Sequence, residues 1–268
     1  MLIKDFNDRK VCDYLDTGAY RNVLIRFRHG LGDSVMFYST CLKALQRRYP
    51  DIRFAYSTHL GQEDIFGRPD DNPDRYDIAF ELVYPCAEWD ADELTKSEKC
   101  AVQELGLPLP LAEEYSLPRN YPSPLVGLHF NVTCLPFMDA PPEFRRRLWT
   151  QIEEAGLIPI DTHMRHYYDN REASVVHDFE QCRRVDDIPA TTDKLLGLLS
   201  CLRGFAGVPS GNLACALALM PARRVMYLTS AFPARKLTRL GVFELNMGRP
   251  YDDALVKDWL DGLEADGK

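Results

Sequence analysis

Apolar residues in the first part of the chain form short continuous runs, separated by segments with apolar side chains at every third or fourth position. The run at residues 23 to 27 is β-rich and leads through glycines into a helical pattern that continues to residue 49. Pro50 ends that pattern, and residues 52 to 58 form the next β-rich run. This order predicts a right-handed βαβ unit with parallel strands. A further strand is expected at residues 77 to 83.

The same pattern restarts after a proline-rich stretch at residues 117 to 124, whose composition favours an extended connector. We therefore predict two domains, residues 1–120 and 121–268. In the second domain the pattern predicts strands at 125–130, 157–163, 204–208 and 224–229, and helices at 142–155, 193–202 and 213–220. A final helix at residues 251 to 263 has one apolar side that needs a packing partner, and packing back on the first domain is one option.

The composition limits the classes of function. With 268 residues, 46% of them hydrophobic, and a formal net charge of -8, the chain can bury a substantial core but has no general attraction for nucleic acid. No apolar segment is long enough to span a bilayer, and the acidic residues near the start do not suit a secretory signal. We therefore expect a cytoplasmic protein, and basic residues between positions 43 and 53 leave peripheral attachment at the inner membrane open. The eight cysteines lack metal-site spacing and are interpreted as reduced core residues.

The turn after the first predicted strand is the first candidate site. Arg28 and His29 precede Gly30-Leu31-Gly32-Asp33. Glycines at a strand-to-helix turn let backbone N–H groups approach a ligand, and the positive helix N-terminus favours an anion there. Asp33 lies where a helix cap is expected, so capping alone is one interpretation and contact with a polar ligand group is the other.

A second turn of this kind lies in the second domain. Residues 207 to 212, Gly-Val-Pro-Ser-Gly-Asn, precede a helix of small residues that can lie close to a sheet. Ser210, Gly211 and Asn212 would offer hydrogen-bond donors to a diphosphate at the helix N-terminus. A tightly packed helix with a Ser or Asn cap is the other interpretation. The repetition of strand, polar turn and helix in both halves favours ligand binding.

The sequence contains no complete motif of several common enzyme classes. The first turn does not complete the dinucleotide fingerprint, because Val35 stands at the third glycine position and no acidic residue ends the second strand. The sequence also lacks a Ser-His-Asp signature, a Walker loop and an Asp-x-Asp metal motif. Hydrolase and phosphoryl-transfer functions therefore have no support, and an NAD(P) oxidoreductase of Rossmann type stays as an alternative.

Three segments together resemble glycosyltransferase family nine, the ADP-heptose heptosyltransferases of lipopolysaccharide assembly. In that family a first strand such as Ile-Leu-Ile-Ile-Arg leads to Gly-Asp and an apolar helix, as residues 23 to 50 do here. Residues 125 to 133 are similar to the family's Ile-Gly-hydrophobic-His-Pro-Gly segment, and residues 208 to 219 to its Val-Asp-Thr-Gly turn and the helix that follows. The resemblance spans most of the chain, and the Gly-Asp turn and the Ser-Gly helix are its more specific parts.

The resemblance implies a GT-B architecture, with two Rossmann-like α/β/α domains whose mostly parallel sheets face each other across a cleft. It also implies a metal-independent inverting glycosyltransferase without a cofactor. Such an enzyme takes a nucleotide-diphosphate sugar as co-substrate and a hydroxyl of a saccharide, glycolipid or other molecule as acceptor. Asp33 would be its catalytic general base. The other implied site residues are Arg28, His29, Gly30 and Gly32 on the acceptor side, and Asn131, Thr133, Ser210, Gly211 and Asn212 on the donor side.

The chain departs from the family pattern at three points. Pro209 stands where the family has Asp, Ala214 stands where it has His, and the loop after residue 130 lacks the Lys that commonly contacts the donor phosphates. The arginines at positions 145 to 147 either replace that positive charge or form a solvated helix face. These departures keep open a degenerate member that binds a nucleotide or sugar without transferring it.

Overall fold

The computed structural model describes residues 1–4, 6, 8–58, 66, 69–82, 96–109, 123–131, 139–162, 192–230 and 241–265. It divides into two units, Met1–Tyr115 and Ser116–Lys268. Each unit has its own parallel sheet with helices packed on it. This arrangement confirms the predicted fold class of two parallel α/β units.

The sheet of the first unit has four parallel strands in the order β1-β4-β2-β3. The strands are β1 (Leu2–Ile3), β2 (Asn22–Arg26), β3 (Arg53–Ser57) and β4 (Ile78–Glu81). Val23, Leu24 and Ile25 of β2 are fully buried, as expected for a parallel strand covered on both faces. Because the strands are parallel, the carboxyl ends of β2, β3 and β4 share one edge of the sheet.

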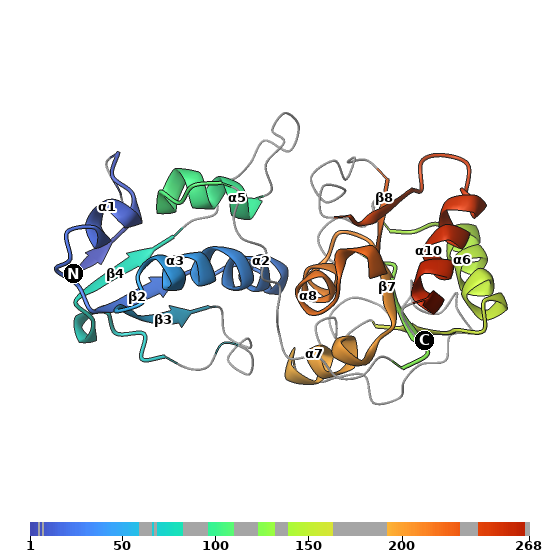
Figure 1. Ribbon diagram of the computed structural model, residues 1–268, viewed down its shortest axis with the longest axis horizontal. Coiled ribbons are helices and arrows are strands. Elements are labelled where there is room, and N and C mark those ends of the chain that lie inside the picture. Colours follow the sequence, from blue (N-terminus) through green and yellow to red (C-terminus); the bar gives the residue numbers. More distant parts are fainter. Residues whose placement is uncertain are drawn as a thin grey trace. The chain divides into compact units, whose positions relative to one another are not determined.

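The helix predicted after β2 forms as a continuous run of three segments, α2 (Leu31–Phe37), a π-helical turn (Tyr38–Leu42) and α3 (Lys43–Arg48) (Figure 1). The hydroxyls of Ser39 and Thr40 donate to the carbonyl oxygens of Val35 and Met36, at 2.7 and 2.6 Å. Such hydrogen bonds to the preceding turn are typical where a helix departs from α geometry. The unit also contains α1 (Val11–Leu15), a 3-10 turn (Pro73–Arg75), α5 (Lys96–Cys100) and a second π turn (Ala101–Leu105).

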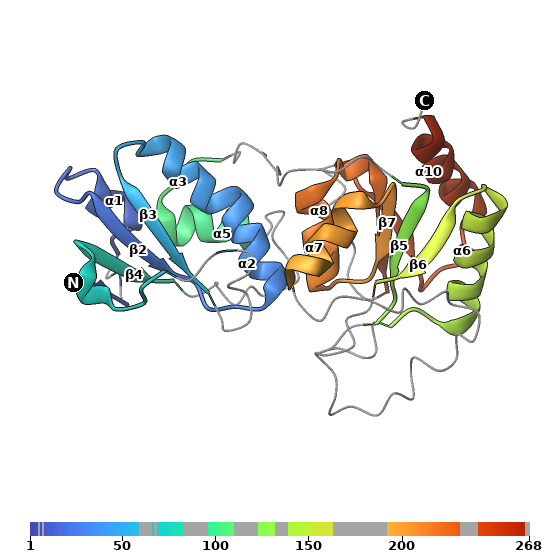
Figure 2. The same ribbon diagram turned by 90° about the horizontal axis from the view of Figure 1, so that it is seen from below.

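The sheet of the second unit has five parallel strands in the order β6-β5-β7-β8-β9. The strands are β5 (Leu125–His129), β6 (Ile158–Asp161), β7 (Gly204–Gly207), β8 (Val225–Thr229) and β9 (Phe243–Asn246). The helical segments are α6 (Pro142–Glu154), α7 (Thr192–Cys201), α8 (Gly211–Leu219), a 3-10 turn (Ala222–Arg224) and α10 (Asp253–Ala265). Helices α7 and α8 cover one face of this sheet and α6 covers the other (Figure 2).

The final helix, α10, packs within its own unit. Its Trp259 and Leu263 are fully buried in a core shared with α6. A Cβ atom on Gly204 of β7 would lie only 2.5 Å from Leu263, so the helix lies directly against that strand. The core of the second unit therefore buries the apolar side of α10, for which the sequence left packing on the first domain as an option.

Two exposed carboxyl groups of the first unit are expected to make its stability depend on acid. The hydrogen bond from the Tyr49 hydroxyl lowers the pKa of Asp16, and the N–H groups of Arg21 and Asn22 lower the pKa of Asp77. Because these folded-state values lie below the unfolded ones, the stabilisation is complete above the unfolded pKa and is lost as pH falls through the folded pKa. Urea unfolding, followed through a signal from the first unit at a series of acid pH values, should show this loss as a falling free energy of unfolding. The free energy of unfolding of Asp77→Asn is expected to depend less steeply on pH. An unchanged dependence would contradict the role assigned to Asp77.

Candidate functional site

The turn after β2 places Asp33 in the first turn of α2. Gly30 occupies the cap position, and Asp33 is the third residue of the helix. The expectation that Asp33 itself caps the helix is therefore wrong, because the chain enters the helix three residues earlier. At this position a carboxylate interacts favourably with the helix dipole, and the side chain is half-buried.

Buried groups beneath the turn hold its backbone in place. The hydroxyl of Tyr56 on β3 donates to the carbonyl oxygen of Ser34 at 3.1 Å, and the hydroxyl of Ser34 donates to the carbonyl oxygen of His29 at 3.2 Å. Burial raises the pKa of Tyr56 well above its ordinary value, and the nearby charge of Asp33 adds to this, so the phenol keeps its proton. The His29 ring packs on Phe27 with 4.4 Å between ring centroids. These contacts therefore hold the backbone that carries His29 and Asp33 in a fixed position.

Two arginines near the end of β2 share one carboxylate. Arg26 donates through Nε to Oδ1 of Asp71 at 3.0 Å, and Arg28 forms an ion pair with Oδ2 of the same residue. The hydroxyl of Ser57 also donates to Asp71, at 2.7 Å, and Glu81 lies 3.7 Å from the Arg26 guanidinium. The structure therefore places Arg28 at the carboxyl edge of the first sheet, and contact with an acceptor stays a prediction.

The space in front of Gly30 is open. Its φ of -55° is accessible to any residue, and a Cβ atom built there meets no atom of the described residues within 4 Å. The backbone therefore does not require glycine at this position. Gly32 follows as the second residue of the helix and is half-buried.

In the second unit, Ser210 caps α8. Its hydroxyl accepts a hydrogen bond from the N–H of Leu213 at 3.2 Å, and its carbonyl oxygen accepts one from Ala214 at 3.2 Å. The capping interpretation of Ser210 is therefore confirmed. The N–H groups of Gly211 and Asn212 precede the helical hydrogen-bond ladder and have no acceptor within the helix.

The side chain of Asn212 points into the protein. Its amide nitrogen donates to the carbonyl oxygen of Thr162 at 2.7 Å and lies 3.1 Å from Nδ1 of His129. Thr162 in turn donates through its hydroxyl to the carbonyl oxygen of Leu128 at 3.0 Å. Because the side-chain amide of Asn212 is engaged inside the protein, the predicted hydrogen bond from Asn212 to a diphosphate can come only from its backbone N–H.

The loop after β5 and the turn before α8 begin at the carboxyl ends of two neighbouring strands, β5 and β7. The N–H of Val208 donates to the carbonyl oxygen of His129 at 3.0 Å, which joins the two segments. Asn131, at the start of the loop, donates through its amide to Asp139 at 3.0 Å. Thr133, the other residue predicted here, lies outside the described residues. The described donor-side residues thus gather at the carboxyl edge of the second sheet.

The three consecutive arginines of α6 have different environments. Arg145 is buried, so the interpretation as a solvated helix face holds only for Arg146 and Arg147, which are exposed. It donates through Nε to the carbonyl oxygen of Ala140 at 2.5 Å, with its guanidinium 5.5 Å from the centre of the Phe130 ring. Its position beside the loop after β5 suits the alternative that this arginine supplies positive charge on the donor side.

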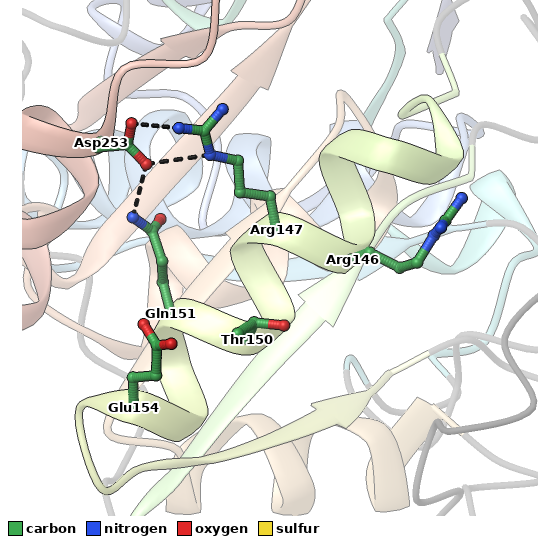
Figure 3. Close-up of a pocket in the computed structure, with 6 residues that line it drawn as sticks. All are labelled: Arg146, Arg147, Thr150, Gln151, Glu154 and Asp253. Atoms are coloured by element: carbon green, nitrogen blue, oxygen red, sulfur yellow. Dashed lines mark hydrogen bonds and ion pairs between the residues drawn. The ribbon is translucent and has the colours of Figure 1, made fainter.

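A shallow depression on the outer side of α6 contains the other two arginines (Figure 3). It is lined by Arg146, Arg147, Thr150, Gln151, Glu154 and Asp253. Asp253 at the start of α10 accepts hydrogen bonds from Arg147 and Gln151, at 3.0 and 2.9 Å. Asp253 thus already partners Arg147, and the contact ties α10 to α6.

Neither a cluster of metal-ligating side chains nor a helix that could span a membrane is present in the described ranges. No three His, Cys, Asp or Glu side chains in them are grouped as metal ligands. No helix in them is long and apolar enough to cross a bilayer. Five described cysteines are outside any disulfide, and all but the half-buried Cys201 are buried: Cys12, Cys41, Cys100, Cys201 and Cys215. For the four buried cysteines, the interpretation as reduced core residues is confirmed.

Sequence reasoning missed three polar residues that organise the two turns. Asp71 lies between two predicted strands in a segment rich in Asp and Pro without a periodic pattern, and its partner arginines are far away in sequence. Tyr56 and Thr162 lie near the carboxyl ends of predicted strands, where polar side chains often face a ligand site in parallel sheets. That position at the carboxyl ends of strands was the signal available.

No protein-family profile matches the chain, and neither does the sequence of any curated protein. Solved structures do match it. Heptosyltransferase II of E. coli, an ADP-heptose lipopolysaccharide enzyme, superimposes with a TM-score of 0.61 over 91% of this chain and 98% of its own, at 16% identity. A family-nine glycosyltransferase from Veillonella parvula superimposes with a TM-score of 0.59 over 92% of this chain and 98% of its own, at 10% identity.

A third matching structure contains a nucleotide-linked heptose. E. coli heptosyltransferase WaaC with ADP-2-deoxy-2-fluoro heptose gives a TM-score of 0.56 over 90% of this chain and 99% of its own, at 14% identity. Both sheets of the present chain are included in alignments of this extent. The chain therefore has the GT-B fold of the family-nine heptosyltransferases.

Proposed function

We propose that this chain is an inverting glycosyltransferase that moves a sugar from a nucleotide-diphosphate sugar to an acceptor hydroxyl. The observation that carries the proposal is the GT-B fold with a carboxylate, Asp33, in the first helical turn after the first unit's central strand. The first unit holds the acceptor, a saccharide, glycolipid or other hydroxyl compound. The second unit holds the donor.

Asp33 is the general base of this reaction. Its carboxylate takes the proton of the acceptor hydroxyl while that oxygen attacks the anomeric carbon of the donor sugar. The new glycosidic C–O bond forms as the bond to the diphosphate breaks, and the nucleoside diphosphate leaves with the electron pair. His29 and Arg28 stand at the same turn and orient the acceptor.

The donor diphosphate is held at the N-terminus of α8. The N–H groups of Gly211 and Asn212 and the positive end of the helix dipole stabilise the charge that grows on the leaving group. Asn131, Thr133 and the cap residue Ser210 complete this side. The buried guanidinium of Arg145 adds positive charge near the loop after β5, in place of the missing Lys. No metal takes part in this scheme, so transfer is expected to persist in EDTA.

A second candidate function is binding of a nucleotide sugar without transfer. Pro209 and Ala214, which replace the family's Asp and His, favour it. This candidate predicts that sugar nucleotides stabilise the protein but are never consumed. An NAD(P) oxidoreductase has less support, because Val35 interrupts the dinucleotide fingerprint.

Thermal unfolding with a panel of ligands tests the proposal. A ligand that binds only the folded protein raises the melting temperature by mass action. We expect nucleotide-diphosphate sugars such as ADP-heptose to raise it, and the nucleoside diphosphate to raise it less. Stabilisation by NAD(P) alone would overturn the proposal.

Gly30→Ser is expected to lower acceptor use without loss of stability. Serine is a good helix cap and fits the backbone at Gly30, so the unfolding free energy should stay within about 0.5 kcal/mol or rise. The new hydroxymethyl group would occupy the open space at the Asp33 turn. Initial rates against acceptor concentration should show a higher KM, whereas unchanged kinetics would place the acceptor elsewhere.

A further inference from the structure

A buried polar network joins three segments of the second unit. Asn212 of α8, His129 at the end of β5 and Thr162 directly after β6 are each at most 7% exposed. The Asn212 amide nitrogen is 2.7 Å from the Thr162 carbonyl oxygen and 3.1 Å from Nδ1 of His129. The network lies beneath the first turn of the helix to which the proposed function assigns the donor diphosphate.

The orientation of the Asn212 amide follows from its partners. A backbone carbonyl oxygen can only accept a hydrogen bond, so the Asn212 atom facing Thr162 must be the NH2 group. Flipping the amide would bring two acceptor oxygens together at 2.7 Å. The Thr162 carbonyl cannot easily move, because the N–H of Thr162 is bonded to Leu128 at 2.9 Å and its hydroxyl to the same oxygen at 3.0 Å.

The protonation of His129 follows from the amide. An NH2 group has two hydrogens and no acceptor. The second hydrogen points to Nδ1 of His129 at 3.1 Å, which is closer than the Thr162 hydroxyl oxygen at 3.5 Å, so Nδ1 accepts it. An imidazole that accepts at Nδ1 is neutral and carries its proton on Nε2. A charged imidazolium would set an N–H against the NH2 group of Asn212.

In the described part of the chain, the elements next to His129 present few ionisable side chains to it. On β6, Asp161 pairs in register with Leu128, so its side chain points to the opposite face of the sheet from that of Thr162. On α8, burial raises the pKa of Cys215 to about 12, so its thiol is uncharged. Strand β7, Gly204–Gly207, has no ionisable side chain.

We propose that Asn212 is a positioning residue that holds His129 as a neutral imidazole protonated at Nε2. Through this contact His129 holds the start of α8, to which the proposed function assigns the donor diphosphate, and it does not act as a base. The role of His129 rests on the proposed function. The tautomer does not, since it follows from the contacts alone.

Nitrogen NMR of the full chain labelled with 15N-histidine tests the tautomer without any substrate. The His129 signal is identified by its loss in His129→Gln. In the wild type we expect the proton on Nε2 and a bare Nδ1. Asn212→Asp should place a proton on Nδ1, because a carboxylate accepts where the amide donated. Protonation of Nδ1 in the wild type, or an unchanged His129 signal in this variant, would overturn the proposal.

A second variant covers the case in which the aspartate prevents folding. Asn212→Ala removes the donor and should give a mixture of both tautomers. Thr162→Val keeps the carbonyl oxygen and the N–H that holds it and removes only the longer 3.5 Å contact of the amide, so it should leave His129 unchanged. A single Nε2 tautomer in Asn212→Ala would contradict the positioning role.

Titration with ADP tests the link to the donor. It should shift the Nε2 signal of His129, and Asn212→Ala should weaken ADP binding by about three- to tenfold. Binding that leaves Nε2 unmoved would overturn the donor-side role. Failure of ADP to bind would count against the proposed function and the role of His129, while the tautomer still decides the role of Asn212.

Discussion

Replacing Asp33 with Asn is expected to lower the rate of sugar transfer by about 10²- to 10⁴-fold and to leave the affinity for the sugar nucleotide unchanged. The amide has the size and shape of the carboxylate but cannot take the proton of the acceptor hydroxyl. The donor groups that we propose belong to the second unit, and all of them are kept in this variant. The rate is measured as transfer to an acceptor, or to water where the acceptor is unidentified, and the donor affinity by calorimetry.

The stability cost of this variant should be small. Asp33 lies in the first turn of α2, where loss of its charge costs about 0.3–1 kcal/mol. Asp51→Asn, at an exposed residue, is the matched control and should leave the rate unchanged. Unchanged turnover in Asp33→Asn would remove Asp33 from the mechanism, and loss of donor affinity would show that the residue acts elsewhere.

Gly127→Ala is expected to destabilise the second unit by about 1–3 kcal/mol through overpacking. A Cβ atom at this central position of β5 would lie 3.0 Å from both Phe205 and Thr162, and closer still to Leu202. All three neighbours are fully buried, so they cannot move aside into solvent. Thermal unfolding should show a melting temperature lower by about 2–4 °C for each kcal/mol.

Gly197→Ala is the matched control for this substitution. Gly197 is an exposed residue of α7, and a Cβ atom there meets nothing within 4 Å. Alanine in a helix interior should therefore raise stability by about 0.5–1 kcal/mol. Equal melting temperatures for the two variants would contradict the packing described around Gly127.

The regular elements around the two turns could be predicted because their patterns are local. The apolar run of β2 and the helical spacing that follows it specify a buried strand and an amphipathic helix without further information. The π turn at Tyr38–Leu42 leaves no such signal, because its side-chain spacing differs from that of an α-helix for a single turn only. Strand β1 could not be predicted either, because its two residues are too few to show a periodic pattern.

The polar contacts of the site depend on residues distant in sequence and could not be predicted. Asn212 and His129 are 83 positions apart, and only the pairing of β5 with β7 brings α8 over His129. In the same way, Asp71 meets Arg26 across 45 positions. The sequence identified Asn212 as a polar residue at a helix start, but its inward orientation is a property of the tertiary fold.

Proton NMR of a reaction with a sugar nucleotide that binds tests the central claim most directly. The anomeric signal of the donor should disappear as a nucleoside diphosphate forms, and the transferred sugar should have the opposite anomeric configuration. Inversion is the outcome expected of a single displacement assisted by Asp33 as base. A bound sugar nucleotide that is never consumed, or a product that keeps the donor configuration, would contradict it.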